Sequence, residues 1–467
     1  MIRPPETYLR RIMPTLRIIL LLAIGHCAVH GVLAQTGLRI SKEGSHLEHT
    51  TGEPFFYLGD TAWELLHRTT EAEVRRYLKD RAGKGFNVIQ TVVLAELEGL
   101  TVPNSQGNLP LEDLDPTRWN EKYFAYVDRV AEMADSLGLC LGILPTWGDK
   151  FNQKWGVGPE IFTPENARTY GRLLGERYGT HHVIWILGGD RNPENDEDLA
   201  IVRAMAAGLR EAVGDRQLIT YHPQGGSRSS DFFAGEEWID FHMFQSGHGR
   251  RDDPQNYNFP RTVRAADPGK PVINGEPAYE DHPINWRPAN GWFDDFDARQ
   301  AAWWSVLSGT AGHTFGNHNI WQLWLPGRDP ISSARTPWTE ALHYPGAAQM
   351  GHLAALMRSL PYYDLRPDGD LLRDAPNSSG REVVLARSGD YSLVLAYTPY
   401  GDALRLPKDR IEAGARTEWF NPRSGESIPF TPDVDGDTYV YDPPFDPARG
   451  NEWVLVIKYD AVSRQRQ

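Results

Sequence analysis

Two acidic residues follow directly on apolar segments that end in glycine. Asp190 comes after Val-Ile-Trp-Ile-Leu-Gly-Gly (183–189), and Glu276 follows Pro-Val-Ile-Asn-Gly (271–275). The glycines let the backbone come close to a ligand. A pair of carboxyl groups can break a glycosidic bond, because one protonates the leaving oxygen while the other attacks the anomeric carbon or activates water. Each acid also has a structural interpretation, Asp190 as a helix cap or a partner of Arg191 and Glu276 as half of an ion pair.

The segments that carry these acids belong to an alternation of short apolar runs and amphipathic stretches between residues 53 and 360. The predicted strands are 55–60, 88–94, 139–146, 183–189, 218–222, 241–245, 271–275 and 312–317. The predicted helices are 71–84, 121–137, 164–178, 198–213, 297–307 and 345–360. Near-continuous hydrophobicity is typical of parallel strands buried on both faces.

Eight such units predict an α/β fold, a (β/α)₈ TIM barrel. A doubly wound open sheet is the alternative. That fold usually has a glycine fingerprint after its first strand, where this chain has Asp60-Thr61-Ala62-Trp63.

In a barrel, function collects at the carboxyl ends of the strands. The fourth and seventh strands end on opposite sides of one mouth, so Asp190 and Glu276 are expected to face each other across a ligand. A separation of about 5–5.5 Å would give retention of anomeric configuration, and about 6.5–9.5 Å would give inversion.

Other strand ends are also polar or aromatic, as expected of a sugar site, where rings bind CH faces and polar groups bind hydroxyls. Trp63, Trp147 and Trp286 are candidate rings, whereas Trp185, Trp303 and Trp304 are expected to pack in the core. Residues 279–282 are a candidate specificity loop. The candidate hydroxyl-binding residues are Asp60, Gln90, Asp149, Lys150, His222, Gln245, His248 and His318.

Several of these segments together resemble the apiosidase-like catalytic family, glycoside hydrolase family 140, formerly a domain of unknown function. The matching stretches are Tyr-Leu-Gly-Asp-Thr-Ala-Trp-Glu-Leu (57–65), Leu-Pro-Thr-Trp-Gly-Asp-Lys (144–150), Trp-Ile-Leu-Gly-Gly-Asp-Arg-Asn (185–192), Asn-Gly-Glu-Pro (274–277) and Tyr-Glu-Asp-His-Pro (279–283). The resemblance implies a retaining hydrolase with Asp190 as acid/base and Glu276 as nucleophile. It also implies exo-acting release of terminal apiose from the pectin rhamnogalacturonan-II. Retaining barrels of this broad clan commonly carry Asn-Glu on strand 4, where this chain has Gly-Asp.

The ends of the chain have different characters. Four arginines, the apolar run 18–24 and Val-Leu-Ala (32–34) predict a secretory signal peptide over residues 1–34. The apolar run is shorter than the roughly 20 residues that span a bilayer. The catalytic domain is then 35–362. Residues 363–467, with short runs separated by Gly, Asp, Asn and Pro, predict an antiparallel β-sandwich that resembles a collagen-binding type of domain.

Composition excludes several classes of protein. Hydrophobic residues are 40% of the 467, charged residues 24%, and the formal net charge is −14. These values are typical of a globular protein and disfavour a nucleic-acid partner. After removal of Cys27 with the signal peptide, Cys140 remains, in an apolar run that predicts burial. We therefore expect an exported protein, periplasmic or on the surface of a bacterium, without a disulfide or a membrane span.

The sequence also bears on cofactors, partners and alternative functions. No cofactor is expected, because the chain has no His-Glu-x-x-His, cysteine cluster, serine-hydrolase elbow or phosphate loop. The expected partner is a plant cell-wall oligosaccharide or polysaccharide. The alternatives are a hydrolase of another furanoside, such as an arabinofuranoside, and a non-catalytic surface protein that binds glycan or collagen.

Overall fold

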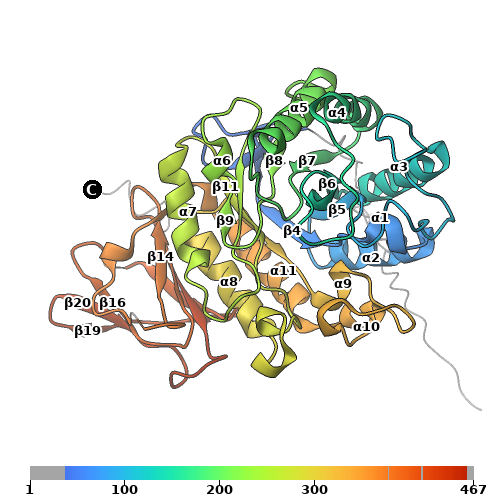
Figure 1. Cartoon of the computed structure of the whole chain (residues 1–467). Helices are drawn as coiled ribbons and strands as arrows, with labels where there is room; N and C mark the ends of the chain where they lie inside the picture. The colour runs from blue at the N-terminus through green and yellow to red at the C-terminus, as the bar shows by residue number, and fades with distance from the viewer. Residues whose placement is uncertain (1–36, 377, 412–413, 460–467) are drawn as a thin grey trace, which may run out of the picture. The chain divides into compact units, whose positions relative to one another are not determined.

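The computed structural model of the chain describes residues 37–376, 378–411 and 414–459 (Figure 1). The predicted signal peptide lies outside these residues. Within them, no helix combines the length and the apolar character needed to cross a bilayer.

A nine-stranded sheet lies at the centre of the N-terminal part. Eight strands are parallel and adjoin in the order β8-β7-β6-β5-β4-β12-β11-β10, and β9 adds to β10 in antiparallel orientation. Their bounds are β4 (Tyr57–Thr61), β5 (Val88–Leu94), β6 (Cys140–Thr146), β7 (Val183–Leu187), β8 (Ile219–Tyr221), β9 (Ser227–Arg228), β10 (His242–Gln245), β11 (Val272–Glu276) and β12 (Gly312–Phe315). Every residue of the eight parallel strands is buried, which explains their continuous hydrophobicity. Each predicted strand is present.

The sheet curls, but its ladder of paired strands stays open between β8 and β10. Three hydrogen bonds link the segments at these edges: from the Asp240 N–H to the Ile219 carbonyl (2.8 Å), from the Ile219 N–H to Asp240 Oδ2 (2.6 Å), and from Thr220 Oγ1 to the Phe241 carbonyl (2.6 Å). The observed architecture is therefore a curled, mostly parallel sheet. The closed barrel that the sequence predicts would need one more strand pairing, between β8 and β10.

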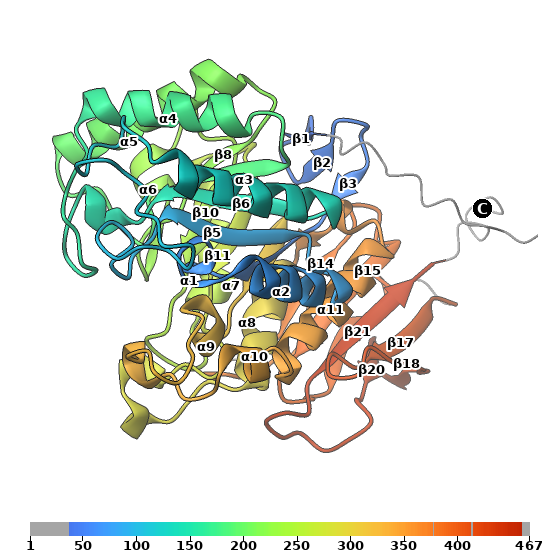
Figure 2. The same ribbon diagram turned by 90° about the vertical axis from the view of Figure 1, so that its right-hand side faces the viewer.

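Helices surround the sheet, as Figures 1 and 2 show. They are α1 (Leu65–Arg68), α2 (Glu71–Gly83), α3 (Glu121–Ser136), α4 (Pro164–Tyr178), α5 (Asp196–Val213), α6 (Ser230–Phe233), α7 (Gln255–Ala266), α8 (Asp295–Leu307), α9 (His318–Trp321), α10 (Trp338–Ala341) and α11 (Pro345–Arg358). Short 3₁₀ turns are η1 (Gly148–Lys150), η2 (Ile284–Trp286), η3 (Pro288–Asn290), η4 (Ile331–Ser333), η5 (Tyr362–Asp364) and η6 (Gly369–Leu371).

Local sequence explains where several helices begin. Thr163 caps α4, with Pro164 in the first turn: its Oγ1 accepts a hydrogen bond from the Asn166 N–H, and its own N–H donates to Asn166 Oδ1. Helix α5 begins two residues earlier than the sequence predicts, because Asn195 accepts a hydrogen bond from the Asp198 N–H. Helix α7 is missing from the prediction because Pro260 lies inside it.

Antiparallel strands make up the rest of the structure. A small sheet precedes the central one and consists of β1 (Leu38–Ile40), β2 (Leu47–His49) and β3 (Pro54–Phe55). After residue 365, a six-stranded sheet contains β13 (Arg366–Pro367), β14 (Val384–Arg387), β15 (Leu393–Thr398), β21 (Trp453–Lys458), β17 (Arg416–Phe420) and β18 (Ser427–Pro429). A second sheet contains β16 (Leu404–Pro407), β20 (Thr438–Tyr441) and β19 (Asp433–Asp435). One apolar cluster includes residues of both sheets, such as Leu455 and Leu406, as the predicted antiparallel β domain requires.

The larger C-terminal sheet packs against α8. Trp303 lies against Tyr397 and Phe420, with ring centroids 6.1 and 6.0 Å apart. Beside these rings, Arg299 Nε lies 2.5 Å from Glu452 Oε1, and both side chains are buried. The contact thus combines a large apolar surface with a buried ion pair.

Replacement of Trp303 by alanine is expected to lower the free energy of unfolding by about 3–5 kcal/mol, because it leaves a cavity between α8 and the C-terminal sheet. Urea denaturation of both proteins measures the change. Phe445→Ala is the control, since Phe445 is 63% exposed and its loss should change stability by less than about 0.5 kcal/mol. Equal midpoints for Trp303→Ala and the unmodified protein would show that the contact does not contribute to stability.

Candidate active site

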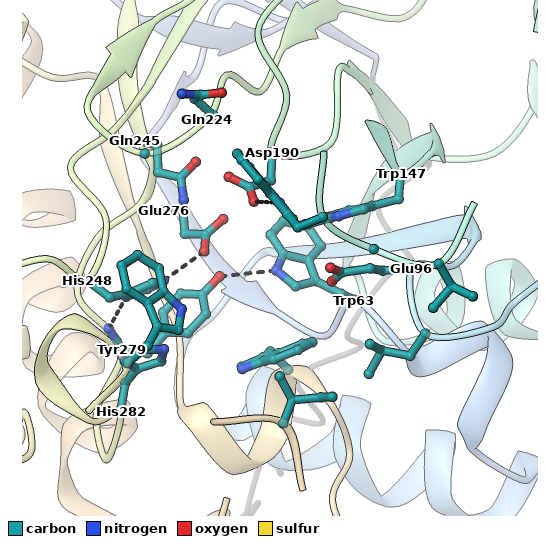
Figure 3. Close-up of a pocket in the computed structure, with 18 residues that line it drawn as sticks. Trp63, Glu96, Trp147, Asp190, Gln224, Gln245, His248, Glu276, Tyr279 and His282 are labelled. Carbon is teal, nitrogen blue, oxygen red and sulfur yellow. Dashed lines mark hydrogen bonds and ion pairs between the residues drawn. The ribbon is translucent and has the colours of Figure 1, made fainter. Parts of the chain in front are cut away.

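A cavity of about 640 Å³ lies at the carboxyl ends of the parallel strands, where the sequence predicts a site. Its walls come from residues that follow β4, β5, β6, β7, β8, β10, β11 and β12, and from the last residues of β10 and β11. The lining residues are Trp63, Glu96, Leu97, Trp147, Trp155, Gly156, Val157, Asp190, Gln224, Gly225, Gln245, His248, Glu276, Tyr279, His282, Trp286, Trp321 and Ile331. Figure 3 shows the carboxyl groups of Asp190 and Glu276 turned toward one another in this space.

The chain after β7 turns sharply before it reaches Asp190. Gly188 and Gly189 have φ angles of 95° and 76°, and Asp190 itself has a φ of 53°. A Cβ atom on Gly189 would lie 2.9 Å from the Thr146 carbonyl oxygen, so only glycine fits beside β6. The turn directs Asp190 into the cavity, where its Oδ2 accepts a hydrogen bond of 2.7 Å from Trp155 Nε1.

Two histidines contact the two oxygens of Glu276, the last residue of β11. His248 Nε2 lies 2.9 Å from Oε1, and His222 Nε2 lies 3.2 Å from Oε2. The Nδ1 atoms of these rings accept main-chain hydrogen bonds of 3.3 Å, His222 from the Asp190 N–H and His248 from the Tyr279 N–H. A neutral imidazole that accepts at Nδ1 carries its proton on Nε2. His248 therefore donates its Nε2–H to Glu276 Oε1, whereas the Nε2–H of His222 lies close to Oε2 without the geometry of a hydrogen bond.

These surroundings drive the pKa values of the two acids apart. Burial and the negative charge of Glu276 raise the pKa of Asp190 to about 7. Burial by itself would raise the pKa of Glu276, but the contacts with His222 and His248 outweigh it and lower the pKa to about 2. At neutral pH the site can thus hold one carboxylic acid beside one carboxylate. Such a difference is typical of an acid and nucleophile pair.

Glu96 is a third carboxyl group in the cavity, which the sequence analysis missed. Burial, together with the negative charges of Asp190, Asp149 and Glu64, raises its pKa well above the ordinary value. A neutral Glu96 can donate a hydrogen bond to a ligand. Its signal in the sequence was its position two residues beyond Leu94, the end of the strand 88–94, whereas we had chosen Gln90 inside that strand.

Indole rings supply much of the remaining wall. Trp63 packs on Trp147, with ring centroids 5.2 Å apart, and its Nε1 donates to the Tyr279 hydroxyl (3.2 Å). Trp155 and Trp286 are 39% and 53% exposed although they are large and apolar. Rings presented to solvent at a cavity suit the CH faces of a sugar.

The structure divides the predicted sugar-binding residues into two groups. Trp63, Trp147, Trp286, Gln245 and His248 line the cavity, as do Tyr279 and His282 of the predicted specificity loop. The residues that lie behind the wall are Asp60, Gln90, Asp149, Lys150, His222 and His318. Each of these six is buried and contacts protein groups, so the structure does not bring them to the cavity wall, and their contact with a sugar stays a prediction. Arg191 is also buried and stacks on Trp155.

Protein contacts account for the positions of these residues one by one. Asp60 Oδ2 binds Arg81 Nε and the Tyr77 hydroxyl, each at 2.5 Å. Lys150 Nζ binds Asp149 Oδ1 at 2.7 Å and the Ala95 carbonyl at 3.0 Å.

The remaining three residues behind the wall are bound in the same way. Gln90 donates to Thr314 Oγ1 (2.7 Å) and to the Gly275 carbonyl (3.2 Å). His318 Nε2 lies 3.1 Å from the carbonyls of Ile331 and Ser332. His222 acts on Glu276 rather than on the cavity. Polar residues at strand ends thus serve mainly to hold the loops that form the wall.

Metal binding was a rival interpretation of the histidines. Across the ranges that the structure describes, no three or more His, Cys, Asp or Glu side chains are grouped so that they could hold a metal ion. His181, for example, contacts Asp135 Oδ2 through Nδ1 at 2.7 Å. Cys140 is buried on β6, and burial raises the pKa of its thiol.

Comparison with known proteins identifies relatives of the whole described chain. The family model described as "Apiosidase-like, catalytic domain" matches residues 41–364, and "Putative collagen-binding domain of a collagenase" matches residues 366–458. A solved structure named "Glycoside hydrolase" is 28% identical, with a TM-score of 0.83 over 92% of this chain and 98% of that one. A glycoside hydrolase family 5 structure from Bacteroides vulgatus is 29% identical, with a TM-score of 0.84 over 93% and 94% of the two chains. A search of curated proteins finds no match.

The buried position of Asp60 leads to a test. Asp60→Asn removes the carboxylate at Arg81 Nε and leaves Asp80, 2.6 Å from Arg81 Nη1, as the remaining counter-charge, so the free energy of unfolding should fall by about 1–3 kcal/mol. Because Asp60 is outside the cavity, KM of the folded variant should stay within about twofold of the unmodified value. Thermal denaturation and steady-state kinetics together measure both quantities. An unchanged melting temperature with a raised KM would instead show that Asp60 contributes to substrate binding.

Proposed function

Since the chain belongs to the apiosidase-like catalytic family and is a glycoside hydrolase, we propose that it cleaves its substrate with retention of configuration. Asp190 is the acid/base and Glu276 the nucleophile. The observation that carries this assignment is the contrast between the two carboxyl groups of one cavity, one with a raised and one with a lowered pKa.

The reaction proceeds by double displacement. In the first step a Glu276 oxygen bonds to the anomeric carbon while the glycosidic oxygen leaves with the Asp190 proton. In the second step Asp190 takes a proton from water, the water oxygen bonds to the anomeric carbon, and the bond to Glu276 breaks. His222 and His248 keep Glu276 ionised and fix the plane of its carboxylate before attack.

The proposed substrate is a pectin side chain, from which the enzyme removes terminal apiose as an exo-acting hydrolase. Family membership supports this choice, and the indole-lined cavity supports a sugar ligand. Hydrolysis of another furanoside, such as an arabinofuranoside, uses the same chemistry and is the alternative. The pair of acids disfavours a purely binding function, because a lectin has no need for carboxyl groups with opposite pKa shifts.

We also propose the surrounding organisation. The chain is exported after loss of residues 1–34, and its catalytic domain (35–362) is a (β/α)₈ barrel whose β8 and β10 edges meet. The C-terminal domain (363–467) braces that barrel through α8. The contacts of Trp303 and Arg299 with the C-terminal sheet support a bracing role.

Substitution of each acid tests the assignment. Glu276→Gln and Asp190→Asn should each lower release of apiose from rhamnogalacturonan-II fragments by at least about 10³-fold, because either change removes a covalent or proton-transfer step. Sugar release is measured by chromatography, with thermal denaturation as the check on folding. Near-normal rates in either folded variant would remove that residue from the mechanism. If the unmodified protein releases no apiose, a panel of aryl glycosides is tested next. Hydrolysis of one of them would identify a different sugar as the substrate, and hydrolysis of none would favour a protein that only binds glycan.

The stereochemistry of the product tests retention directly. Proton NMR during the first minutes of hydrolysis should show the anomer of the substrate before mutarotation. Initial formation of the opposite anomer would mean that Glu276 activates water instead of attacking.

The two pKa shifts predict the pH dependence of kcat/KM. Glu276 must be ionised for attack. Because its pKa is lowered to about 2, the carboxylate stays ionised even at pH values well below 4. Asp190 must be protonated, and its pKa of about 7 makes activity fall as pH rises through about 7. We therefore expect a broad profile with an alkaline limb near pH 7, measured with an aryl glycoside. A profile that rises through pH 7 would contradict the role of Asp190 as acid.

A further inference from the structure

Trp155 makes a contact with Asp190 that the proposed mechanism has not used. It lies in the segment between η1 and α4, and its Nε1 donates to Asp190 Oδ2 at 2.7 Å. The Arg191 guanidinium lies 4.1 Å from the centre of the indole ring, and Arg191 Nη2 donates to the Trp155 carbonyl at 2.8 Å. Arg191 therefore covers one face of the indole ring, while Trp155 lines the cavity and stays 39% exposed.

The indole makes the two oxygens of Asp190 unequal. Its N–H can only donate, and the carbonyl oxygen of a carboxylic acid accepts a hydrogen bond better than the hydroxyl oxygen does. Oδ2 is therefore the carbonyl oxygen when Asp190 is protonated, and Oδ1 carries the proton. Within residues 37–376, 378–411 and 414–459, no protein hydrogen bond to Oδ1 competes for that proton.

We propose that Trp155 is a positioning residue that fixes the transferable proton on Oδ1 of Asp190, facing the glycosidic oxygen. This inference rests on the proposed function. It concerns the cleavage step, in which the proton moves from Oδ1 to the leaving oxygen while Oδ2 keeps the indole hydrogen bond. The charge that develops on Asp190 then already has a donor in place.

Buried charges hold the segment that carries Trp155. Asp149 Oδ2 accepts hydrogen bonds from the N–H groups of Val157 (2.9 Å) and Gly158 (2.8 Å). Gly156 lies between the indole and these anchors with a φ of 87°, and a Cβ there would lie 2.5 Å from Asp149 Oδ2. The Asp149–Lys150 pair, predicted to bind sugar hydroxyls, instead fixes the loop whose indole holds the acid.

The other ionisable groups that face Asp190 are Glu276, His222, Arg191, Glu96 and Tyr221. None of them is hydrogen-bonded to its carboxyl group within the described ranges. Trp155 is the hydrogen-bond donor to its carboxyl group within the described ranges. Removal of the indole N–H therefore isolates one interaction.

The test compares two substrates that differ in their need for an acid. Trp155→Phe keeps an aromatic ring over Arg191 but removes the N–H. With phenyl and 2,4-dinitrophenyl glycosides of the sugar that the unmodified enzyme releases, kcat/KM should fall at least about tenfold for phenyl but less than about threefold for dinitrophenyl, whose leaving group needs little protonation. The alkaline limb should move up by about half a unit or more, because loss of a hydrogen bond to the charged form raises the pKa of Asp190.

Control variants separate this role from simple packing. Trp286→Phe alters an exposed ring of the same cavity and should change both substrates by the same factor, without a shift of the limb. Trp155→Leu removes ring and N–H together and should show at least the selectivity of Trp155→Phe, provided that melting curves show folded protein. Equal losses on both substrates with an unmoved limb would overturn the role of Trp155 and leave the proposed function intact. Absence of hydrolysis by the unmodified enzyme would instead overturn the proposed function.

Discussion

The contact between the Glu276 carboxylate and two imidazole rings, one of them hydrogen-bonded to it, is the interaction on which the site depends. It keeps a buried carboxylate ionised, and that negative charge in turn helps to keep Asp190 protonated. The arrangement is coupled through the backbone, because the N–H of Asp190 itself orients His222. The His222 ring thus links the backbone of Asp190 to the carboxylate of Glu276. The turn after β7, which positions Asp190, therefore also affects the surroundings of Glu276.

Buried ion pairs hold the loops around this centre. Asp149 and Lys150 fix the segment that carries Trp155, and Asp60 with Arg81 ties β4 to α2. Glu64 accepts a hydrogen bond from the Leu97 N–H at 3.0 Å and so holds the wall that contains Glu96. Such pairs are costly to bury, so they contribute little net stability. Their value here is geometric, since each fixes a wall of the cavity.

The C-terminal sheets extend this rigidity outward. Trp303 and Arg299 on α8 contact the larger sheet, and α8 leads directly into β12 of the central sheet. The chain segment from Asp295 to Phe315 therefore connects the outer β domain to the strand that lies between β4 and β11.

The sequence by itself determined the eight parallel strands, their order along the chain and six of the helices, but not α7, whose pattern Pro260 interrupts. Continuous apolar runs predicted all eight parallel strands, and glycine-acid junctions indicated Asp190 and Glu276, because burial and turns are local properties of the chain. The direction in which a side chain at a strand end points is not local. Asp60, Asp149 and Lys150 have the same residue types as a sugar site, yet they turn to protein partners. Glu96 and Trp155 reach the cavity from loops whose course depends on those partners, so only the tertiary structure could decide which polar residues face the substrate.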